Sequence, residues 1–376
     1  MLAVRGPSAP VTPLVLRWAR ETAGFDFDTA ASKAGNVSAA KIESVEHGDD
    51  SLTLNQARKL ADVYERPFAL LFLPAPPDEE PLDVQFRRLR DAPKLPWPPE
   101  MRALARRLPA LQDAVDALFD ATDEVPAWPS AFSELRGRRP LESADALREK
   151  VEVSLAIQKQ AARSDAQGFR AFRVWREAIE NLGVLVIQDG GLDVDQMRGF
   201  VSPHERVPAI VINTNDDVRA RLFTLVHELG HLIWPDAPEE EFERFAATVL
   251  MPPQPFSTDF AAASGPSLLE KIDSLARSYA VTSDATAVRV GWLKLASWDE
   301  VNEVREAIKS RGGPKKPKGG NHYRNVIARY GPGLVGRTLT AVNEGAISDL
   351  AAARLLGVRV PAFGRLRDEL SGGSGA

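Results

Sequence analysis

The stretch RARLFTLVHELGHLIWP constrains the fold of this chain more than any other. It places His227 and His231 four positions apart in an apolar run, with Glu228 between them. Residues at i and i+4 lie on the same face of an α-helix, so the spacing predicts a helix over 217–233 whose imidazoles can chelate one metal ion. Glu228 is rotated by about 100° from His227 around that helix, within reach of a water at the metal. The alternative is a structural helix that happens to carry two histidines.

Two further features of this stretch favour the metal site. The chain has five histidines, and two of them stand at this spacing beside a glutamate. Gly230 lies inside the predicted helix, where glycine costs about 1 kcal/mol relative to alanine. A glycine at that position indicates close packing or close approach of a substrate.

A third ligand has to come from elsewhere in the chain, because two imidazoles do not complete a metal site. The segment EEEFERFAATVLMP (239–252) is predicted to be an amphipathic helix that begins with an acidic cluster. Acidic residues in a first turn are also favoured by the helix dipole alone, without any metal. The chain has no cysteine, so His, Asp and Glu must supply the ligands. This set suits zinc (Zn2+), although manganese or iron use the same ligands.

The two segments RLFTLVHELGHLIW and EEEFERFAATVLMP together resemble the ImmA/IrrE family of zinc metallopeptidases. In the register of that resemblance, His227, His231 and Glu239 are the metal ligands and Glu228 is the catalytic base. Phe242–Glu243 stands where the family has an alanine–asparagine pair, and the gap from His231 to Glu239 is short. Glu240 and Glu243 therefore remain alternatives for the third ligand.

The resemblance also implies a zincin-like core, in which an edge strand pairs with an extended substrate. By its position before the predicted helix, AIVINTN (209–215) is expected to be that strand, with an ordinary core strand as the alternative. His204 is a candidate for stabilising an oxyanion, although a plain surface histidine is the simpler interpretation. Trp234 is a candidate for a wall of the substrate cleft.

Composition restricts the class of protein. The net charge is −5 and the hydrophobic content 44%, which are ordinary for a globular protein and unlike a generic nucleic-acid binder. The absence of cysteine excludes disulfides and fits a reducing cytoplasm. We find no signal peptide and no run of eighteen apolar residues, so we expect a cytoplasmic protein without a membrane partner.

The pattern along the chain predicts an α+β protein that is mostly helical. Short helices separated by glycine turns resemble an Xre-type helix-turn-helix domain over 1–73, with Ser38 and Thr53 opening two of them. A proline-rich linker (74–100), a zincin-like metallopeptidase domain (101–300) and a C-terminal helical extension (301–376) follow. The metallopeptidase domain is expected to begin with helices over 101–182 and to contain strands at 183–188 and 207–215.

The sequence gives little support to DNA binding by the first domain. Its third helix, SAAKIESVEH, offers Lys41 and His47 against Glu43 and Glu46, and residues 1–90 carry 11 lysines and arginines against 13 aspartates and glutamates. DNA binding requires neutralisation of phosphates, so a protein-docking role is the alternative. The basic loop KSRGGPKKPKGGNHYR (309–324) is either a second candidate for nucleic acid or a solvated loop.

The sequence therefore predicts an intracellular zinc endopeptidase with a regulatory role. By resemblance, its substrate would be a transcriptional repressor or another regulatory protein. The alternative is a non-catalytic DNA-binding regulator or antitoxin-like partner in which the peptidase fold is a scaffold.

Overall fold

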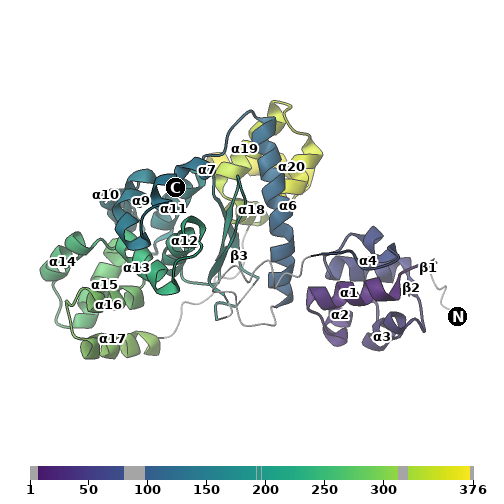
Figure 1. The fold of residues 1–376 in the computed structure, drawn as a ribbon, viewed down its shortest axis with the longest axis horizontal. Coiled ribbons are helices and arrows are strands. Elements are labelled where there is room, and N and C mark those ends of the chain that lie inside the picture. The colour runs from purple at the N-terminus through teal and green to yellow at the C-terminus, as the bar shows by residue number, and fades with distance from the viewer. Residues whose placement is uncertain (1–6, 80–97, 192, 196, 312–320, 373–376) are drawn as a thin grey trace. The chain divides into compact units, whose positions relative to one another are not determined.

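The structure is a computed structural model, and it describes residues 7–79, 98–191, 193–195, 197–311 and 321–372 (Figure 1). These residues divide into two compact units. The first comprises the described residues up to Glu79 together with 98–108, and the second comprises those from Pro109 onward. Most of the expected linker lies outside the described residues. The finer division into four segments stays a prediction.

The first unit is a small helical domain with one two-stranded sheet. Its elements are β1 (Ser8–Ala9), α1 (Pro13–Ala23), α2 (Phe27–Ala34), α3 (Ala39–His47), β2 (Leu52–Thr53), α4 (Leu54–Val63) and the 3-10 helix η1 (Phe68–Phe72). Ser38 and Thr53 cap α3 and α4 as expected, and Thr53 forms a capping box with Gln56. The helix-turn-helix assignment of this unit stays a prediction.

The charges on α3 differ from the expectation in one respect. Glu46 is buried and accepts hydrogen bonds of 2.8 and 2.9 Å from the guanidinium of Arg20 on α1. Lys41 is 3.4 Å from Asp50. Glu46 is therefore a core residue that joins two helices, and it does not oppose nucleic acid at the surface.

Helix α6 (Pro99–Ala121) contains residues of both units, and the rest of the second unit is mostly helical around a three-stranded sheet. The sheet consists of β3 (Leu185–Asp189), β4 (Gly199–Ser202) and β5 (Ala209–Asn213). The helices before it are α7 (Trp128–Ala131), α8 (Ser133–Arg136), η2 (Pro140–Ser143), α9 (Ala144–Lys150), α10 (Leu155–Ser164) and α11 (Phe169–Glu180). Those directly after it are α12 (Val218–Ile233), α13 (Glu239–Leu250), α14 (Pro253–Ala262), α15 (Leu268–Tyr279), α16 (Ser283–Trp292) and α17 (Trp298–Ser310).

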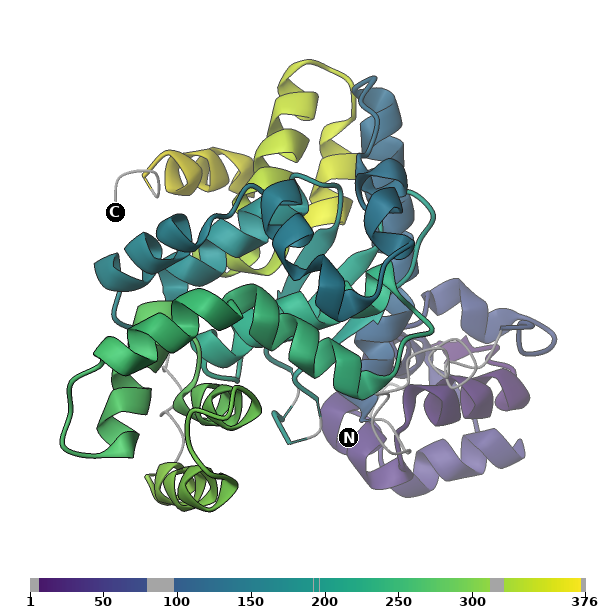
Figure 2. The same ribbon diagram turned by 60° about the vertical axis from the view of Figure 1, so that its left-hand side comes forward.

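The C-terminal helices are α18 (His322–Tyr330), α19 (Pro332–Asn343), α20 (Asp349–Leu356), η3 (Val360–Ala362) and α21 (Phe363–Gly372). Within the second unit, α19 and α20, in yellow, lie at one end, while α14 to α17, in green, lie toward the opposite end (Figures 1 and 2). The expectation of a mostly helical α+β chain with a small sheet is confirmed. None of the described helices combines the length and the apolar character needed to cross a membrane.

The sheet order corrects one prediction. The order is β3-β5-β4, with β3 parallel and β4 antiparallel to β5. The segment 209–215 is therefore the central strand, and its prediction as the edge strand is wrong. All five residues of β5 are buried, as expected of a strand with neighbours on both sides. The edge strand on the antiparallel side is β4, which the sequence analysis did not predict.

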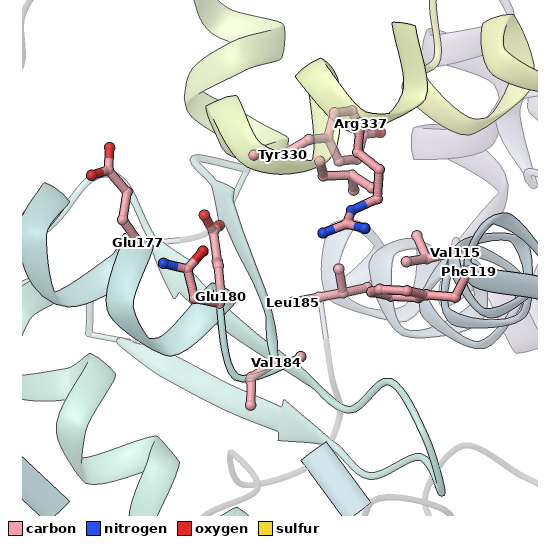
Figure 3. A pocket seen from close by; sticks show the side chains of 12 residues that line it. Val115, Phe119, Glu177, Glu180, Val184, Leu185, Tyr330 and Arg337 are labelled. Carbon is pink, nitrogen blue, oxygen red and sulfur yellow. The ribbon is translucent and has the colours of Figure 1, made fainter. Parts of the chain in front are cut away.

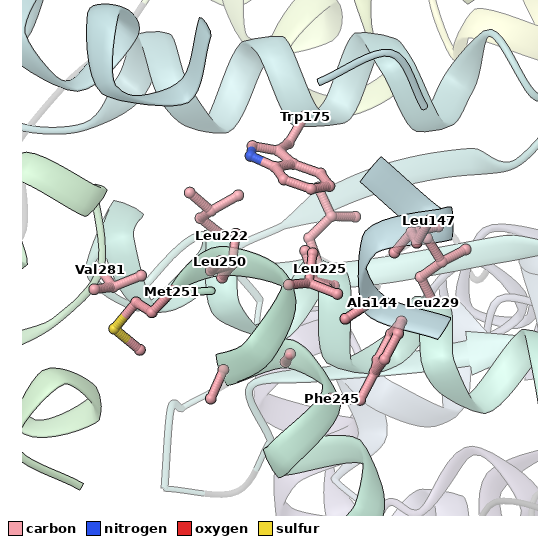
Figure 4. Packing of buried hydrophobic residues seen from close by; sticks show 14 of the residues in the cluster. Ala144, Leu147, Trp175, Leu222, Leu225, Leu229, Phe245, Leu250, Met251 and Val281 are labelled. Carbon is pink, nitrogen blue, oxygen red and sulfur yellow. The ribbon is translucent and has the colours of Figure 1, made fainter. Parts of the chain in front are cut away.

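The main core lies between α11, α12 and α13. Trp175, Leu222, Leu225, Leu229 and Phe245 all belong to one buried cluster (Figure 4). Trp234 also belongs to this core, because it is buried against Phe245 and its indole N–H donates to the Leu135 carbonyl at 3.0 Å. These contacts give no support to its prediction as a wall of the cleft.

Candidate metal centre

Helix α12 presents the two histidines as the spacing predicts. Asp217 caps the helix by accepting a hydrogen bond from the Arg219 backbone N–H. In the last two turns of the helix, the Nε2 atoms of His227 and His231 lie 3.2 Å apart. The side chains are 13% and 9% exposed, so both imidazoles open onto one small polar site.

The third residue of the site is Glu239, the first residue of α13. Its Oε1 lies 2.9 Å from Nε2 of His227, and its Oε2 lies 3.3 Å from Nε2 of His231. The Oε2 atom is buried and has no hydrogen-bond partner among the described residues. One atom from each of these three residues therefore faces the same point, and all three lie within 4.8 Å of one another. Two imidazole nitrogens and a carboxylate that converge in this way fit a divalent cation such as zinc.

The alternatives for the third ligand do not reach this point. Glu240 and Glu243 are exposed, and neither belongs to the group of three. A signal in the sequence could have excluded them. The apolar stripe of α13 runs through Phe242, Phe245, Ala246 and Val249, and its helical period extends back to Glu239 but not to Glu240 or Glu243.

Phe242 packs directly behind the site. Its ring centroid lies 4.1 Å from that of His231 and 6.0 Å from that of His227, and the side chain is fully buried. A Cβ atom at Gly230 would lie 2.9 Å from Cδ1 of Phe242. Gly230 therefore provides the close packing that its position predicts, because it lets the Phe242 ring pack against α12 beside His231.

Three buried side chains anchor the other end of α13. Arg148 donates to the Val249 carbonyl at 2.5 Å, Gln158 donates to Leu250 at 3.0 Å, and Arg289 donates to Met251 at 2.8 and 3.0 Å. Burial lowers the pKa of both arginines to about 10. Carbonyl groups at a helix C-terminus interact favourably with such cations. Together, the three side chains fix this end of α13.

Glu228 faces the sheet. Its side chain is buried, and its Cγ would lie 3.2 Å from a Cβ placed on Gly199, the first residue of β4. The same Cβ would lie 2.6 Å from Cγ2 of Thr224 and 3.0 Å from the Val211 carbonyl oxygen. Glycine at 199 thus allows the edge strand to approach the helix that carries the predicted base.

The open edge of β4 has backbone groups that point away from β5. The Asn213 N–H donates to the Arg198 carbonyl at 2.8 Å, and Gly199 pairs with Ile212 in the register. Hydrogen-bonded pairs alternate along an antiparallel ladder, so the N–H and C=O groups of Gly199 and Val201 face outward. Among the described strands, β4 has β5 as its single neighbour.

His204 lies apart from this group. Its Nδ1 accepts hydrogen bonds from the backbone N–H groups of Arg206 and Val207, and its Nε2 lies 3.5 Å from Asp113. These contacts stabilise the loop between β4 and β5. They give no support to the oxyanion prediction for His204.

A helix with two histidines and a glutamate, completed by a carboxylate from the next helix, is typical of a metallopeptidase site. The comparison with protein families agrees with this class. Residues 179–290 match the Peptidase_M78 family, described as the IrrE N-terminal-like domain. The match includes the sheet and α12 and α13, and it supports the resemblance to the ImmA/IrrE family. No curated protein and no solved structure matches the chain.

Proposed function

We propose that this protein is an intracellular zinc-dependent endopeptidase. The observation that carries the proposal is the convergence of His227, His231 and Glu239 on one point, next to a strand with an open edge. A zinc ion bound there would polarise a scissile carbonyl and make a water molecule more acidic. Similarity to a metallopeptidase family supports the same conclusion.

The residues of the chain supply the remaining steps of hydrolysis. Glu228 accepts a proton from the attacking water and delivers it to the leaving amine, as a general base and then a general acid. An extended substrate segment pairs with the outward backbone groups of Gly199 and Val201, which places its peptide bond beside Glu228. The substrate must therefore offer an unfolded or loop segment. We infer a regulatory protein such as a transcriptional repressor, on the resemblance alone.

Metal content tests the site, and cleavage tests the base. We expect near-stoichiometric zinc in the wild type and in Glu240→Ala, and a strong loss of zinc in Glu239→Ala. Glu228→Gln should retain zinc but lose cleavage of a library of extended peptides. Zinc retained by Glu239→Ala would disprove the third ligand, while full cleavage by Glu228→Gln would disprove the mechanism.

For the first unit, we propose protein docking rather than DNA binding. The basic residue that α3 offers, Lys41, is already close to Asp50, and its neighbour Glu43 is exposed. A mobility-shift titration with DNA fragments at two salt concentrations tests this proposal. Salt-dependent specific binding would overturn it and favour the regulator alternative.

A further inference from the structure

A second site lies in the second unit, where the C-terminal helices meet the sheet. A pocket of about 90 Å³ is lined by residues of α6, the end of α11, the start of β3, and the helices α18 and α19 (Figure 3). Its lining combines part of the segment that matches the peptidase family with residues outside that segment. The proposed peptidase function does not use this pocket.

The lining has an apolar side and two opposite charges. Phe119, Leu185 and Leu334 contribute apolar surface. The carboxylate of Glu180 and the guanidinium of Arg337 extend toward the pocket from α11 and α19 (Figure 3). An apolar cavity with a few fixed polar groups is the usual form of a small-molecule site.

Both charges are already held in place by the protein. Glu180 accepts a hydrogen bond of 2.7 Å from Arg176, and its carboxylate lies next to Gly331 and Gly333 at the start of α19. Arg337 pairs with Glu124 and lies over the ring of Phe119 at 4.8 Å. A carboxylate can accept about four hydrogen bonds and a guanidinium can donate five, so each group retains capacity for a ligand.

We propose that this pocket binds a small zwitterion with an apolar side chain, of the α-amino acid class. The ammonium group would bind Glu180, the carboxylate would bind Arg337, and the side chain would pack on Phe119, Leu185 and Leu334. A cavity of 150 Å³ accommodates benzene, so about 90 Å³ suits the side chain alone, of three or four carbons. The ammonium and carboxylate groups of the ligand would lie at the rim of the pocket. A ligand with one charge would form a charged hydrogen bond to only one of these two groups and would lose the contribution of the other.

The position of the pocket connects it to the peptidase sheet. Arg176 also donates to the carbonyls of Val186 on β3 and of Ala328 on α18, at 2.6 Å each. A ligand on Glu180 would therefore bind next to a contact that joins α11, β3 and α18. β3 pairs with β5, and β5 leads into α12. Ligand binding would therefore stabilise the two strands that precede the metal-binding helix.

Calorimetric titration of the full-length protein tests the ligand class. The probes are L-leucine, isoamylamine and 4-methylpentanoate, which share the same branched carbon chain. We expect L-leucine to bind and each singly charged analogue to bind at least about tenfold more weakly, as expected for loss of one hydrogen bond to a charged group. Equal binding of either analogue would overturn the zwitterion assignment.

Two pairs of variants test the location. A Cβ at Gly333 points toward Glu180, with Oε2 3.9 Å away, whereas a Cβ at Gly336 on the same helix meets nothing within 4 Å. Gly333→Leu should abolish leucine binding and Gly336→Leu should not. Arg337→Gln should weaken binding at least about tenfold, while the exposed Arg354→Gln should have no effect. Absence of leucine binding to the wild type, or binding unchanged in Gly333→Leu, would refute the proposal. Zinc content and peptide cleavage are measured separately, so failure here leaves the peptidase proposal intact.

Discussion

Gly230→Ala is the most informative single change at the metal centre, because two effects of opposite sign compete. Alanine is favoured over glycine inside a helix by about 1 kcal/mol. The new Cβ would, however, lie 2.9 Å from Cδ1 of Phe242 and 3.4 Å from Cδ1 of Phe245. Favourable carbon–carbon contacts begin at about 3.5 Å, and both rings are fully buried, so they have little room to move.

The magnitude follows from these two effects. Overpacking a dense core by one methyl group costs about 1–3 kcal/mol. This cost equals or exceeds the gain of about 1 kcal/mol from helix propensity. Gly336→Ala provides the matched control, because it is also a helical glycine but its Cβ would meet nothing within 4 Å. The control should therefore gain about 1 kcal/mol, and Gly230→Ala should lie about 1–3 kcal/mol below it.

The assay is urea unfolding of the metal-free protein, followed by a zinc titration of each variant. Because Phe242 contacts His231, a displaced ring should also weaken zinc binding in Gly230→Ala but not in Gly336→Ala. Combining Gly230→Ala with Phe242→Leu should remove most of the penalty, which a double-mutant cycle measures as coupling between the two sites. If Gly230→Ala is as stable as the control and binds zinc normally, the packing argument is refuted.

Three further predictions concern other parts of the chain. Gly199→Ala should cost about 1–3 kcal/mol and reduce peptide cleavage, because its Cβ would lie 3.0 Å from the Val211 carbonyl. Gly364→Ala, a helical glycine whose Cβ meets nothing within 4 Å, should lose neither stability nor cleavage. Glu46→Ala should leave Arg20 buried without its carboxylate and cost about 3 kcal/mol, seen as faster hydrogen exchange in α1 and α3; unchanged exchange would contradict this. Burial raises the pKa of Glu180 from 4.5 to about 7, so the folded state binds this proton more tightly than the unfolded state does. The associated stability is fully present below pH 4.5 and is lost as the pH rises to about 7, a loss of up to about 3 kcal/mol. Unfolding at pH 5 and 8 should show a smaller loss in Glu180→Gln than in the wild type, and equal losses would refute the assignment.

The parts of the fold that could be predicted are those encoded locally. The spacing of His227 and His231 predicts α12 to within one residue at its start, and the glycines after α1 and α3 mark the ends of these helices. Within 101–182, which is predicted to be helical, residues 151–154 separate α9 from α10. Even there, Ser154 caps α10 by accepting from the Ile157 N–H, a signal of the kind that Ser38 provides for α3.

The order of the strands could not be predicted in this way. A run of β-branched residues such as AIVIN indicates a buried strand, but burial does not distinguish a central strand from an edge strand covered by helices. The strand that does lie at the edge, β4, has two apolar residues, Phe200 and Val201, between Gly199 and Ser202. Such a run is too short for a periodicity argument. Its position depends on Gly199 packing against Thr224 and Glu228, which are far away in the sequence.

The third ligand shows how local pattern and distant contacts combine. The apolar stripe of α13 leaves Glu239 and Glu241 in phase with the core and excludes Glu240 and Glu243. The rotation of the helix about its axis then decides which carboxylate meets the imidazoles. That rotation is fixed by Phe242 behind His231 and by Arg148 and Arg289 at the opposite end.

Buried arginines without a carboxylate partner are costly, and helix C-terminal carbonyls compensate that cost in one orientation of the helix. Arg148 and Arg289 come from α9 and α16, 101 and 38 residues away from the carbonyls they bind. Since each residue of a helix is rotated by about 100° from the last, fixing the carbonyls of Val249 and Met251 also fixes the direction of Glu239. The carboxylate at the metal centre is therefore selected by contacts about ten residues further along the same helix, which the sequence of α12 and the first turn of α13 does not contain.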